Sequence, residues 1–346
     1  MPATRAEVGS RTRPVATRPS LLRRAVPWGL IALGVVAAVA LQTQLYSGEE
    51  RTVTTIFMFV ALAQAWNLIG GFAGYASFGQ VVFFGIGGYT TAVLMAHERL
   101  SFWPSLLFSG VFAAAFGAVI GLPLLRLRGH YFAIATLGVA EGSREVVTNM
   151  PGLTGGGAGI TVPVVGPHAS TAWLGNDGFY VLFLVLAASA VVVSTFVSRS
   201  KFGYALRAIN QEEDAAASMG INTTATKVTV FALSGFIVGL IGAAYAFEQV
   251  TIYPERLFDA DISVLMVVMV VIGGSGTILG PVIGAVALQY LSEYLRHHSP
   301  EFHTFILGGI IIATVVLLPQ GAVNYVREAV RERDFSLLRN IRRFRL

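Results

Sequence analysis

Long stretches without a charged residue alternate with short polar segments along the chain. A hydrocarbon core about 30 Å thick is crossed by roughly 20 apolar residues in a helix, so each such stretch is a candidate membrane span. The stretches fit ten helices, with eight and nine as alternative counts. They lie between residues 24 and 49, at 52–96 (two helices), 100–125, 129–149, 178–198, 228–247, 262–292 (two helices) and 302–326. The pattern predicts an all-α polytopic membrane protein.

The two stretches that are long enough for two helices each carry glycines where they would break. In residues 69–88, IGGFAGYASFGQVVFFGIGG, the breaks are expected at Gly70-Gly71 and Gly74. In residues 262–292 the break is expected at 273–276 or at Pro281. Irregular backbone at membrane depth is tolerated only where protein or a water-filled cavity covers it. Corresponding glycine interruptions in the two halves suggest an inverted structural repeat, which is frequent in transport folds.

The composition agrees with a membrane protein. Of the residues, 54% are hydrophobic and 12% are charged, whereas about a quarter are charged in a soluble domain. The chain has no cysteine, which excludes disulfides, Cys-ligated metals and thiol nucleophiles. It also lacks the HExxH, GxSxG and phosphate-loop motifs of common enzymes. We therefore expect neither an enzyme nor a bound cofactor or metal.

The basic residues predict the orientation, because lysine and arginine near helix ends are retained on the cytoplasmic side. Ten spans place both termini in the cytoplasm, and 19 of the 24 basic residues then fall on cytoplasmic segments. The net charge of +5 is thereby explained by membrane insertion and by contact with anionic lipid. It does not indicate a nucleic-acid partner. The predicted organisation is a basic cytoplasmic tail (1–24), a transmembrane domain (25–326) with an extracytoplasmic loop (150–177) and a cytoplasmic loop (199–227), and a second basic cytoplasmic tail (327–346).

The cytoplasmic loop 199–227 is the only sizeable internal hydrophilic segment. Ala205, Ala208 and Ile209 recur at helical spacing, as do Ala215, Ala216 and Met219. This pattern predicts two short surface helices, with Gly220 and Asn222 as the stop. The loop is either a solvated connector or a docking element for a partner.

Four polar residues within the predicted spans are candidates for a translocation pathway. They are Gln64, Asn67, Gln80 and Glu141. The three amides either form hydrogen bonds between helices or line the pathway. Glu141 is an ionisable group flanked by apolar residues, which is costly in a membrane and indicates function. Alternatively, it pairs with Arg144 at i,i+3 near the aqueous interface.

Five segments of the chain form a series with a recognisable order and spacing: residues 67–94, 126–141, 153–160, 200–222 and 271–285. Together they resemble the LivM-type permease subunit of branched-chain amino acid ABC importers. Within the loop, DAAASMG at 214–220 resembles the ABC-permease motif E-A-A-three residues-G, with Asp214 in place of glutamate. The resemblance implies that this loop couples the permease to an ATPase. The residues concerned are Arg207, Glu212, Glu213, Asp214, Ala215, Ala216 and Gly220.

The resemblance also implies the function and the partners. We expect a permease subunit in the bacterial cytoplasmic (inner) membrane that translocates branched-chain or other hydrophobic amino acids. Its partners would be a second permease subunit of the LivH type, two ATP-binding subunits and an extracytoplasmic binding protein. Alternatives are a urea or short-chain amide ABC permease, an ion-coupled carrier and a membrane scaffold. Ion-coupled carriers place ionisable groups in mid-span, and here only Glu141 qualifies. This scarcity favours transport that is driven by a separate partner acting on the cytoplasmic loop.

Overall fold

The computed structural model describes residues 21–42, 47–163, 176–298, 301–317 and 321–332, most of which are helical. Within these residues, ten long helices correspond to the ten helices that the apolar stretches predict. They are α1 (Leu21–Gln42), α2 (Ser47–Asn67), α3 (Val81–Ala96), α4 (Phe102–Leu124), α5 (His130–Thr148), α7 (Asn176–Arg199), α10 (Thr223–Gln249), α12 (Ala260–Gly273), α13 (Leu279–His298) and α14 (His303–Leu317).

Shorter elements connect the long helices. They are a π-helical turn η1 (Leu68–Phe72), α6 (Pro151–Thr154), a 3-10 turn η2 (Gly156–Ala158), α8 (Lys201–Gln211), α9 (Glu213–Ser218), α11 (Pro254–Leu257) and α15 (Ala322–Glu332). Strand β1 (Ile160–Thr161) pairs antiparallel with β2 (Thr251–Ile252), with Ile160 opposite Ile252. The two strands join the segment after α6 to the segment after α10.

In the part of the chain that the structure describes, four helical segments are long and apolar enough to cross a membrane. They are Gly48–Phe72, Phe102–Leu124, Asp177–Arg199 and Thr223–Gln249. The predicted class, an all-α membrane protein, is thereby confirmed. Helices α3, α12 and α14 have 16, 14 and 15 residues, which is fewer than the roughly 20 needed for a perpendicular span. The count of ten spans stays a prediction.

The glycine breaks lie where the sequence predicts them. Helix α2 passes into the π-helical turn at Leu68, and Gly74 follows with a φ of 77°. Helix α12 ends at Gly273 and α13 begins at Leu279, so that Pro281 lies in the first turn of α13. Proline is tolerated there because the first amide groups of a helix have no partner within the helix.

The prediction of one helix over 302–326 is wrong. Helix α14 ends at Leu317, and α15 begins at Ala322, directly after Gly321. Gly321 has a φ of 80°, and its Cα is packed against the backbone of Gly274, where a Cβ would collide. Only glycine adopts this backbone at low cost, so the chain turns within the apolar stretch. Residues 1–20 and 333–346 of the predicted basic tails lie outside the described residues.

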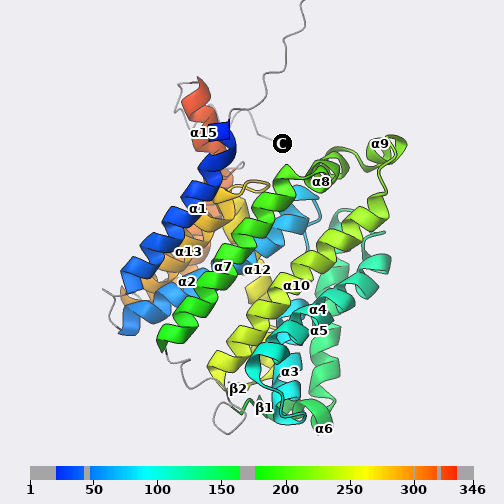
Figure 1. Cartoon of the computed structure of the whole chain (residues 1–346), viewed down its shortest axis with the longest axis vertical. Helices are drawn as coiled ribbons and strands as arrows, with labels where there is room; N and C mark the ends of the chain where they lie inside the picture. The colour runs from blue at the N-terminus through cyan, green and yellow to red at the C-terminus, as the bar shows by residue number, and fades with distance from the viewer. Residues whose placement is uncertain (1–20, 43–46, 164–175, 299–300, 318–320, 333–346) are drawn as a thin grey trace, which may run out of the picture.

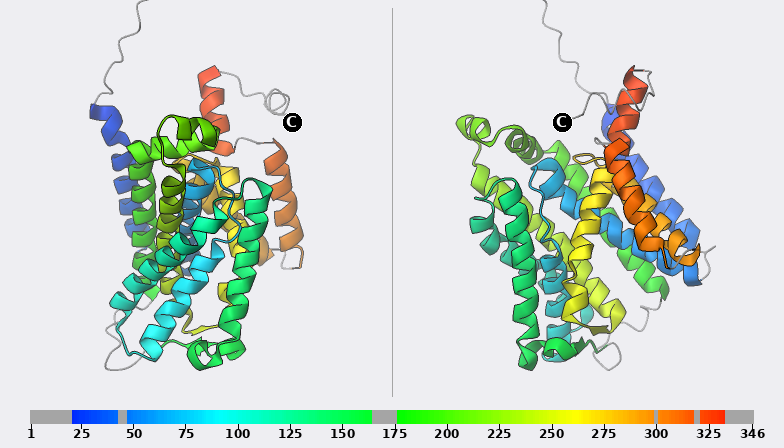
Figure 2. Two further views of the ribbon diagram at one scale, coloured as in Figure 1. Left: turned by 90° about the vertical axis from the view of Figure 1, so that its right-hand side faces the viewer. Right: turned by 180° about the vertical axis from the view of Figure 1, so that it is seen from behind.

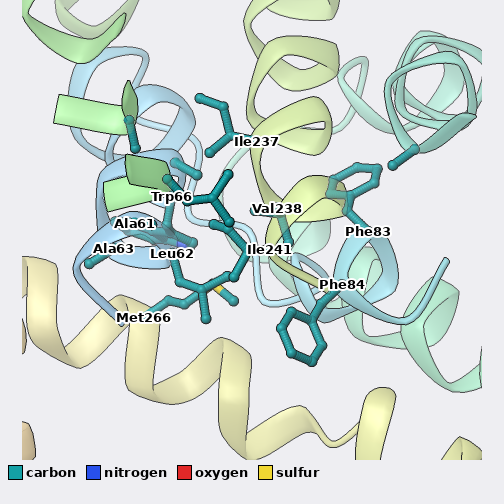
Figure 3. Packing of buried hydrophobic residues seen from close by; sticks show 14 of the residues in the cluster. Ala61, Leu62, Ala63, Trp66, Phe83, Phe84, Ile237, Val238, Ile241 and Met266 are labelled. Atoms are coloured by element: carbon teal, nitrogen blue, oxygen red, sulfur yellow. The ribbon is translucent and has the colours of Figure 1, made fainter. Parts of the chain in front are cut away.

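Helix α10 lies at the centre of the bundle, where it packs against α3, α4 and α2. Figure 3 shows Ile237, Val238 and Ile241 of α10 between Trp66 of α2 and Phe83 of α3. The close approach of α3 and α10 depends on glycine, because a Cβ on Gly87 would meet the backbone of Gly239. Small residues bring membrane helices together in this way.

The connecting elements gather at two opposite ends of the bundle. Helices α8, α9 and α15 lie at one end, which we call the α9 end, whereas α6, β1 and β2 lie at the other, which we call the strand end (Figures 1 and 2). The predicted cytoplasmic loop and the described part of the predicted extracytoplasmic loop are therefore at opposite ends. This separation agrees with the predicted topology, while the side of the membrane that each end faces stays a prediction.

Candidate functional site

Helix α8 lies at the end of α7, and local contacts hold it there. The hydroxyl of Ser200 accepts a hydrogen bond from the backbone N–H of Gly203 at 3.2 Å, which caps the start of the helix. Leu206 and Ile209 are buried. The guanidinium of Arg207 donates to the carbonyl of Ser198 in the last turn of α7, where a positive charge is favoured. The predicted first surface helix is confirmed, and Arg207 anchors it.

Helix α9 follows after a single residue and presents two different faces. Ala216 is completely buried against the bundle, whereas Ala215, Ala217 and Met219 are exposed. Gly220, with a φ of 86°, ends the helix as predicted. Asn222 has another role than the predicted stop, because its side chain accepts from the amide of Ala225 and caps the start of α10.

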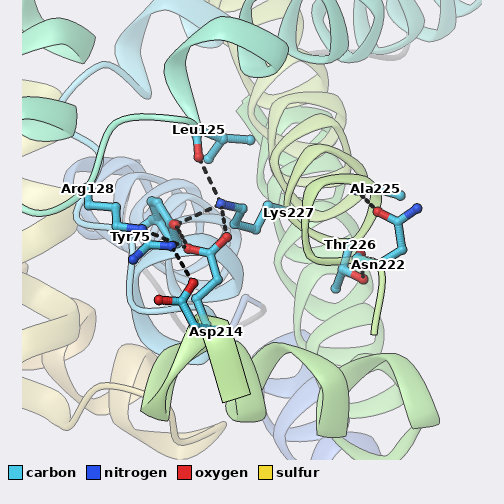
Figure 4. Close-up of polar contacts among 9 residues, drawn as sticks. Tyr75, Leu125, Arg128, Asp214, Asn222, Ala225, Thr226 and Lys227 are labelled. Carbon is cyan, nitrogen blue, oxygen red and sulfur yellow. Dashed lines mark hydrogen bonds and ion pairs between the residues drawn. The ribbon is translucent and has the colours of Figure 1, made fainter. Parts of the chain in front are cut away.

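A cluster of polar side chains, which we call the Lys227 cluster, fixes α9 to the bundle (Figure 4). Lys227, in the first turns of α10, is 4% exposed. Its Nζ lies 2.6 Å from Glu213 Oε1, 2.9 Å from the hydroxyl of Tyr75 and 2.8 Å from the carbonyl oxygen of Leu125. The hydroxyl of Tyr75 in turn donates to Glu213 Oε2 at 2.9 Å. All three ammonium protons thus have an acceptor.

Arg128 extends the cluster to the protein surface. Its Nε lies 3.4 Å from Glu213 Oε2, and its terminal nitrogen donates to Asp214 Oδ1 at 3.0 Å. The side chains of Arg128 and Asp214 are 61% and 76% exposed, so this ion pair contributes little to stability. Its position at the outer edge of the cluster adds a positive charge beside Glu213.

The cluster keeps Glu213 ionised although the carboxylate is largely buried. Burial by itself raises the pKa of Glu213, but hydrogen bonds from Lys227 and Tyr75, together with the charges of Lys227 and Arg128, outweigh it and lower the pKa below its usual value. Burial raises the pKa of Tyr75. At neutral pH Glu213 is therefore a carboxylate and Tyr75 is a neutral phenol.

The arrangement connects four parts of the chain at one point. Tyr75 follows α2, Leu125 ends α4, Glu213 begins α9 and Lys227 lies in α10. A displacement of α9 is resisted by a buried, fully hydrogen-bonded ion pair, and it therefore acts on the ends of α2, α4 and α10. Such a connection can transmit mechanical force between a surface helix and the helices of the bundle.

The three amides predicted within the spans are buried and form contacts between segments. Asn67 donates to the carbonyl of Thr277 at 2.8 Å and accepts from the amide of Gly276 at 2.9 Å. Gln64 donates to the carbonyl of Ile278 at 2.6 Å. Gln80 Oε1 accepts from Ser234 of α10 at 3.2 Å. These contacts agree with the interpretation as hydrogen bonds between helices, and they bring the two glycine-rich breaks together.

Glu141 does not join these residues. Its side chain is 61% exposed on the outer surface of α5 and forms an ion pair with Arg144, one turn along the same helix. Arg144 also contacts Glu145 at 3.5 Å. The ion pair between Glu141 and Arg144, one of the two alternatives that the sequence predicts, is thus formed. A role of Glu141 in translocation stays a prediction.

Sequence reasoning missed Tyr75, Arg128 and Lys227 as parts of the site. The sequence contains one indication of the role of Lys227. The chain has only two lysines, and Lys227 lies at the start of an apolar helix. A lysine in that place needs a buried anion. The sequence does not show which of the neighbouring acidic residues supplies it.

A bundle of apolar helices with a structured loop anchored at one end has the architecture of a transport permease. The chain belongs to the family of branched-chain amino acid transport system permease components, whose family model matches residues 48–315. The expected resemblance to LivM-type permeases is confirmed.

Three curated relatives illustrate the similarity. The high-affinity branched-chain amino acid transport system permease protein LivM of Salmonella typhimurium is 32% identical over 325 residues, which cover 87% of this chain and 76% of the relative; LivM of Escherichia coli K12 has the same values. The probable LivM protein of Methanocaldococcus jannaschii is 23% identical over 77% of this chain and 90% of its own length. No solved structure matches the chain.

Proposed function

We propose that this ABC permease subunit translocates branched-chain or other hydrophobic amino acids into the cell. The substrate class is supported by the names of the relatives, which are branched-chain amino acid transport permeases. ATP would be hydrolysed by separate partner subunits, since the chain carries no lysine-bearing phosphate loop. The chain would lie in the cytoplasmic membrane of a bacterium with ten spans and both termini in the cytoplasm.

The observation that carries the coupling role is the anchoring of α9 by the Lys227 cluster. A solvated connector has no need for a buried ion pair, whereas an element that receives force from a partner does. We assign the exposed face of α9, with Ala215 and Met219 at its centre and Glu212 and Asp214 at its start, to the ATPase subunit. Arg207, Glu213, Ala216 and Gly220 would hold this face in position.

The remaining partners follow from the two ends of the bundle. With the α9 end in the cytoplasm, the strand end faces the extracytoplasmic side and would receive the substrate-binding protein. A second permease subunit would pack beside this one in the membrane. The predicted boundaries of the tails and loops are part of the same proposal.

Uptake by the reconstituted complex tests the function. The permease, its second membrane subunit, the two ATPase subunits and the binding protein are assembled in proteoliposomes, and uptake of labelled leucine, isoleucine, valine, urea and acetamide is measured. We expect ATP-dependent uptake of the three amino acids. Uptake of urea or acetamide instead would contradict the substrate class, and uptake by the chain alone under an ion gradient would contradict the ATP-driven mechanism.

A substitution on α9 tests the docking surface. Ala215→Arg places a bulky charge on the exposed face and should weaken ATPase binding roughly thirtyfold, which corresponds to about 2 kcal/mol for a blocked central contact. Thr161→Arg, exposed at the strand end, is the matched control. Wild-type ATPase binding by Ala215→Arg would exclude this face from the docking surface.

A further inference from the structure

A cavity of about 500 Å³ opens into the bundle far from the Lys227 cluster. It is lined by the start of α2, from Gly48 to Phe59, and by the end of α10 at Glu248 and Gln249. Both of these helix ends lie towards the strand end. Ligand pockets in proteins typically have volumes of roughly 300–1,000 Å³, so the cavity is large enough for a small metabolite.

Some of the residues that line the cavity are apolar. They include Met58 and Phe59 of α2, Phe84 of α3, Leu265 of α12 and Leu288 of α13. Aromatic and branched aliphatic side chains of this kind stabilise an apolar group through burial. The walls therefore suit a ligand with an aliphatic part.

Two groups of opposite charge line the same cavity and attract each other without forming an ion pair. Arg51 lies in the first turns of α2, and Glu248 lies in the last turn of α10. Among the described residues, neither side chain has an ion-pair partner within 4.0 Å. The other charged lining residues are already paired, since Glu293 lies 3.4 Å from Arg296 and 3.2 Å from His297. Arg51 and Glu248 are therefore open to an external ligand.

A buried amide adds a third polar contact. Gln289 of α13 lines the cavity, is only 8% exposed, and has no side-chain hydrogen bond within the described part of the chain. Its amide can donate to one ligand atom and accept from another.

We propose that this cavity is a binding site for a small zwitterionic amino acid with an apolar side chain. Arg51 binds the α-carboxylate, Glu248 binds the α-ammonium group, Gln289 donates or accepts a further hydrogen bond, and the apolar walls surround the side chain. A zwitterion satisfies both unpaired charges, whereas urea or a neutral amide leaves both of them unpaired. The proposal rests on the proposed import of amino acids and places a substrate site within this subunit.

Photo-crosslinking of the complete transporter tests the site directly. The purified complex, in nanodiscs without ATP, is irradiated with a diazirine analogue of leucine, and the labelled peptides are identified by mass spectrometry. We expect labelling in residues 47–67 and 279–298 that excess leucine abolishes. Leucinamide, which lacks the carboxylate, and 4-methylpentanoate, which lacks the ammonium group, should compete at least tenfold less well than leucine.

Variants identify the charged contacts. Arg51→Gln and Glu248→Gln should each reduce labelling at least tenfold, whereas Glu255→Gln, an exposed carboxylate of α11 outside the cavity, should not. Copurification of the partner subunits shows that the variants are folded, and the competition series in the wild-type complex does not depend on them. Absence of labelling at both segments, or equal competition by the three compounds, would overturn the proposal. Uptake of leucine by the wild-type complex separately reports the proposed function.

Discussion

Lys227 and Glu213 form an ion pair in which Nζ and Oε1 lie 2.6 Å apart, with the two side chains only 5% and 15% exposed. Burying two charges is costly unless the remaining hydrogen-bonding groups are also satisfied. Here Tyr75 and the carbonyl of Leu125 accept the other ammonium protons, and Tyr75 and Arg128 contact the second carboxylate oxygen. The pair fixes the first turn of α9 to the first turns of α10.

Replacing Lys227 with methionine should release α9 from the bundle. The substitution leaves Glu213 as a buried carboxylate without its main cation, and breaking a buried pair on one side typically costs about 3–5 kcal/mol. We expect faster hydrogen exchange throughout 213–218 and loss of ATP-dependent uptake, with membrane insertion unchanged. Hydrogen exchange with mass spectrometry and uptake in proteoliposomes measure the two effects.

The chain supplies its own control for this experiment. Lys201 is the only other lysine, and it is exposed in the first turn of α8. Lys201→Met should leave exchange in α9 and uptake at wild-type levels. If Lys227→Met behaves in the same way, the buried ion pair does not couple α9 to the bundle.

The anchoring of α9 should also depend on pH, in a direction that follows from the lowered pKa of Glu213. A carboxyl group whose pKa falls on folding contributes stability above its ordinary pKa of 4.5, and this contribution is lost as the pH falls below that value. We expect constant protection of α9 between pH 6 and 8 and a loss of protection below about pH 4.5. Hydrogen exchange corrected for intrinsic rates measures this.

The variant Glu213→Gln separates this effect from general acid denaturation. Because glutamine does not titrate, the pH-dependent loss specific to α9 should disappear in the variant. Peptides from α4 provide the internal reference. An unchanged pH dependence in the variant would show that another group is responsible.

The sequence predicts the elements better than the contacts between them. The glycines at 70, 71, 74, 273, 274 and 276 indicate breaks because they lack a side chain that would hold the helix, and both breaks are present. The two short helices in 199–227 follow from the spacing of small and apolar residues. These are local effects, and a single sequence contains them.

Local patterns of glycine and of apolar residues do not predict contacts between distant segments. Glu213 and Lys227 are close in sequence. Tyr75 and Leu125 join them only because the ends of α2 and α4 lie at the same level as the start of α10. Ala215 and Ala216 are the same residue type, yet one is exposed and the other is buried, because α9 lies against the bundle on one side only. The break at Gly321 was missed for a similar reason, since its backbone packs against Gly274 from a distant segment.

Asn67 should contribute mainly to stability. Asn67→Leu removes the hydrogen bonds to Gly276 and Thr277 and leaves a partly buried backbone N–H and a partly buried carbonyl without these partners, at a cost of at most about 1–3 kcal/mol for each group. We expect a lower melting temperature of the purified complex and an unchanged KM for the folded fraction. Asn149→Leu, at an exposed position at the end of α5, is the control. A changed KM at an unchanged melting temperature would instead place Asn67 in the translocation pathway.

The two ends of the bundle should be reached by reagents from opposite sides of the membrane. Because the chain has no cysteine, single cysteines can be labelled without background. Ser218→Cys at the end of α9 and Gly152→Cys in α6 are both exposed, and Gly152 has open space around its Cα. With 19 of 24 basic residues on the predicted cytoplasmic segments, an impermeant thiol reagent should label Gly152→Cys in spheroplasts and Ser218→Cys only after the membrane is opened. Uptake by both variants serves as the control for correct assembly. The reverse labelling pattern would invert the topology and would remove α9 from the reach of any cytoplasmic ATPase.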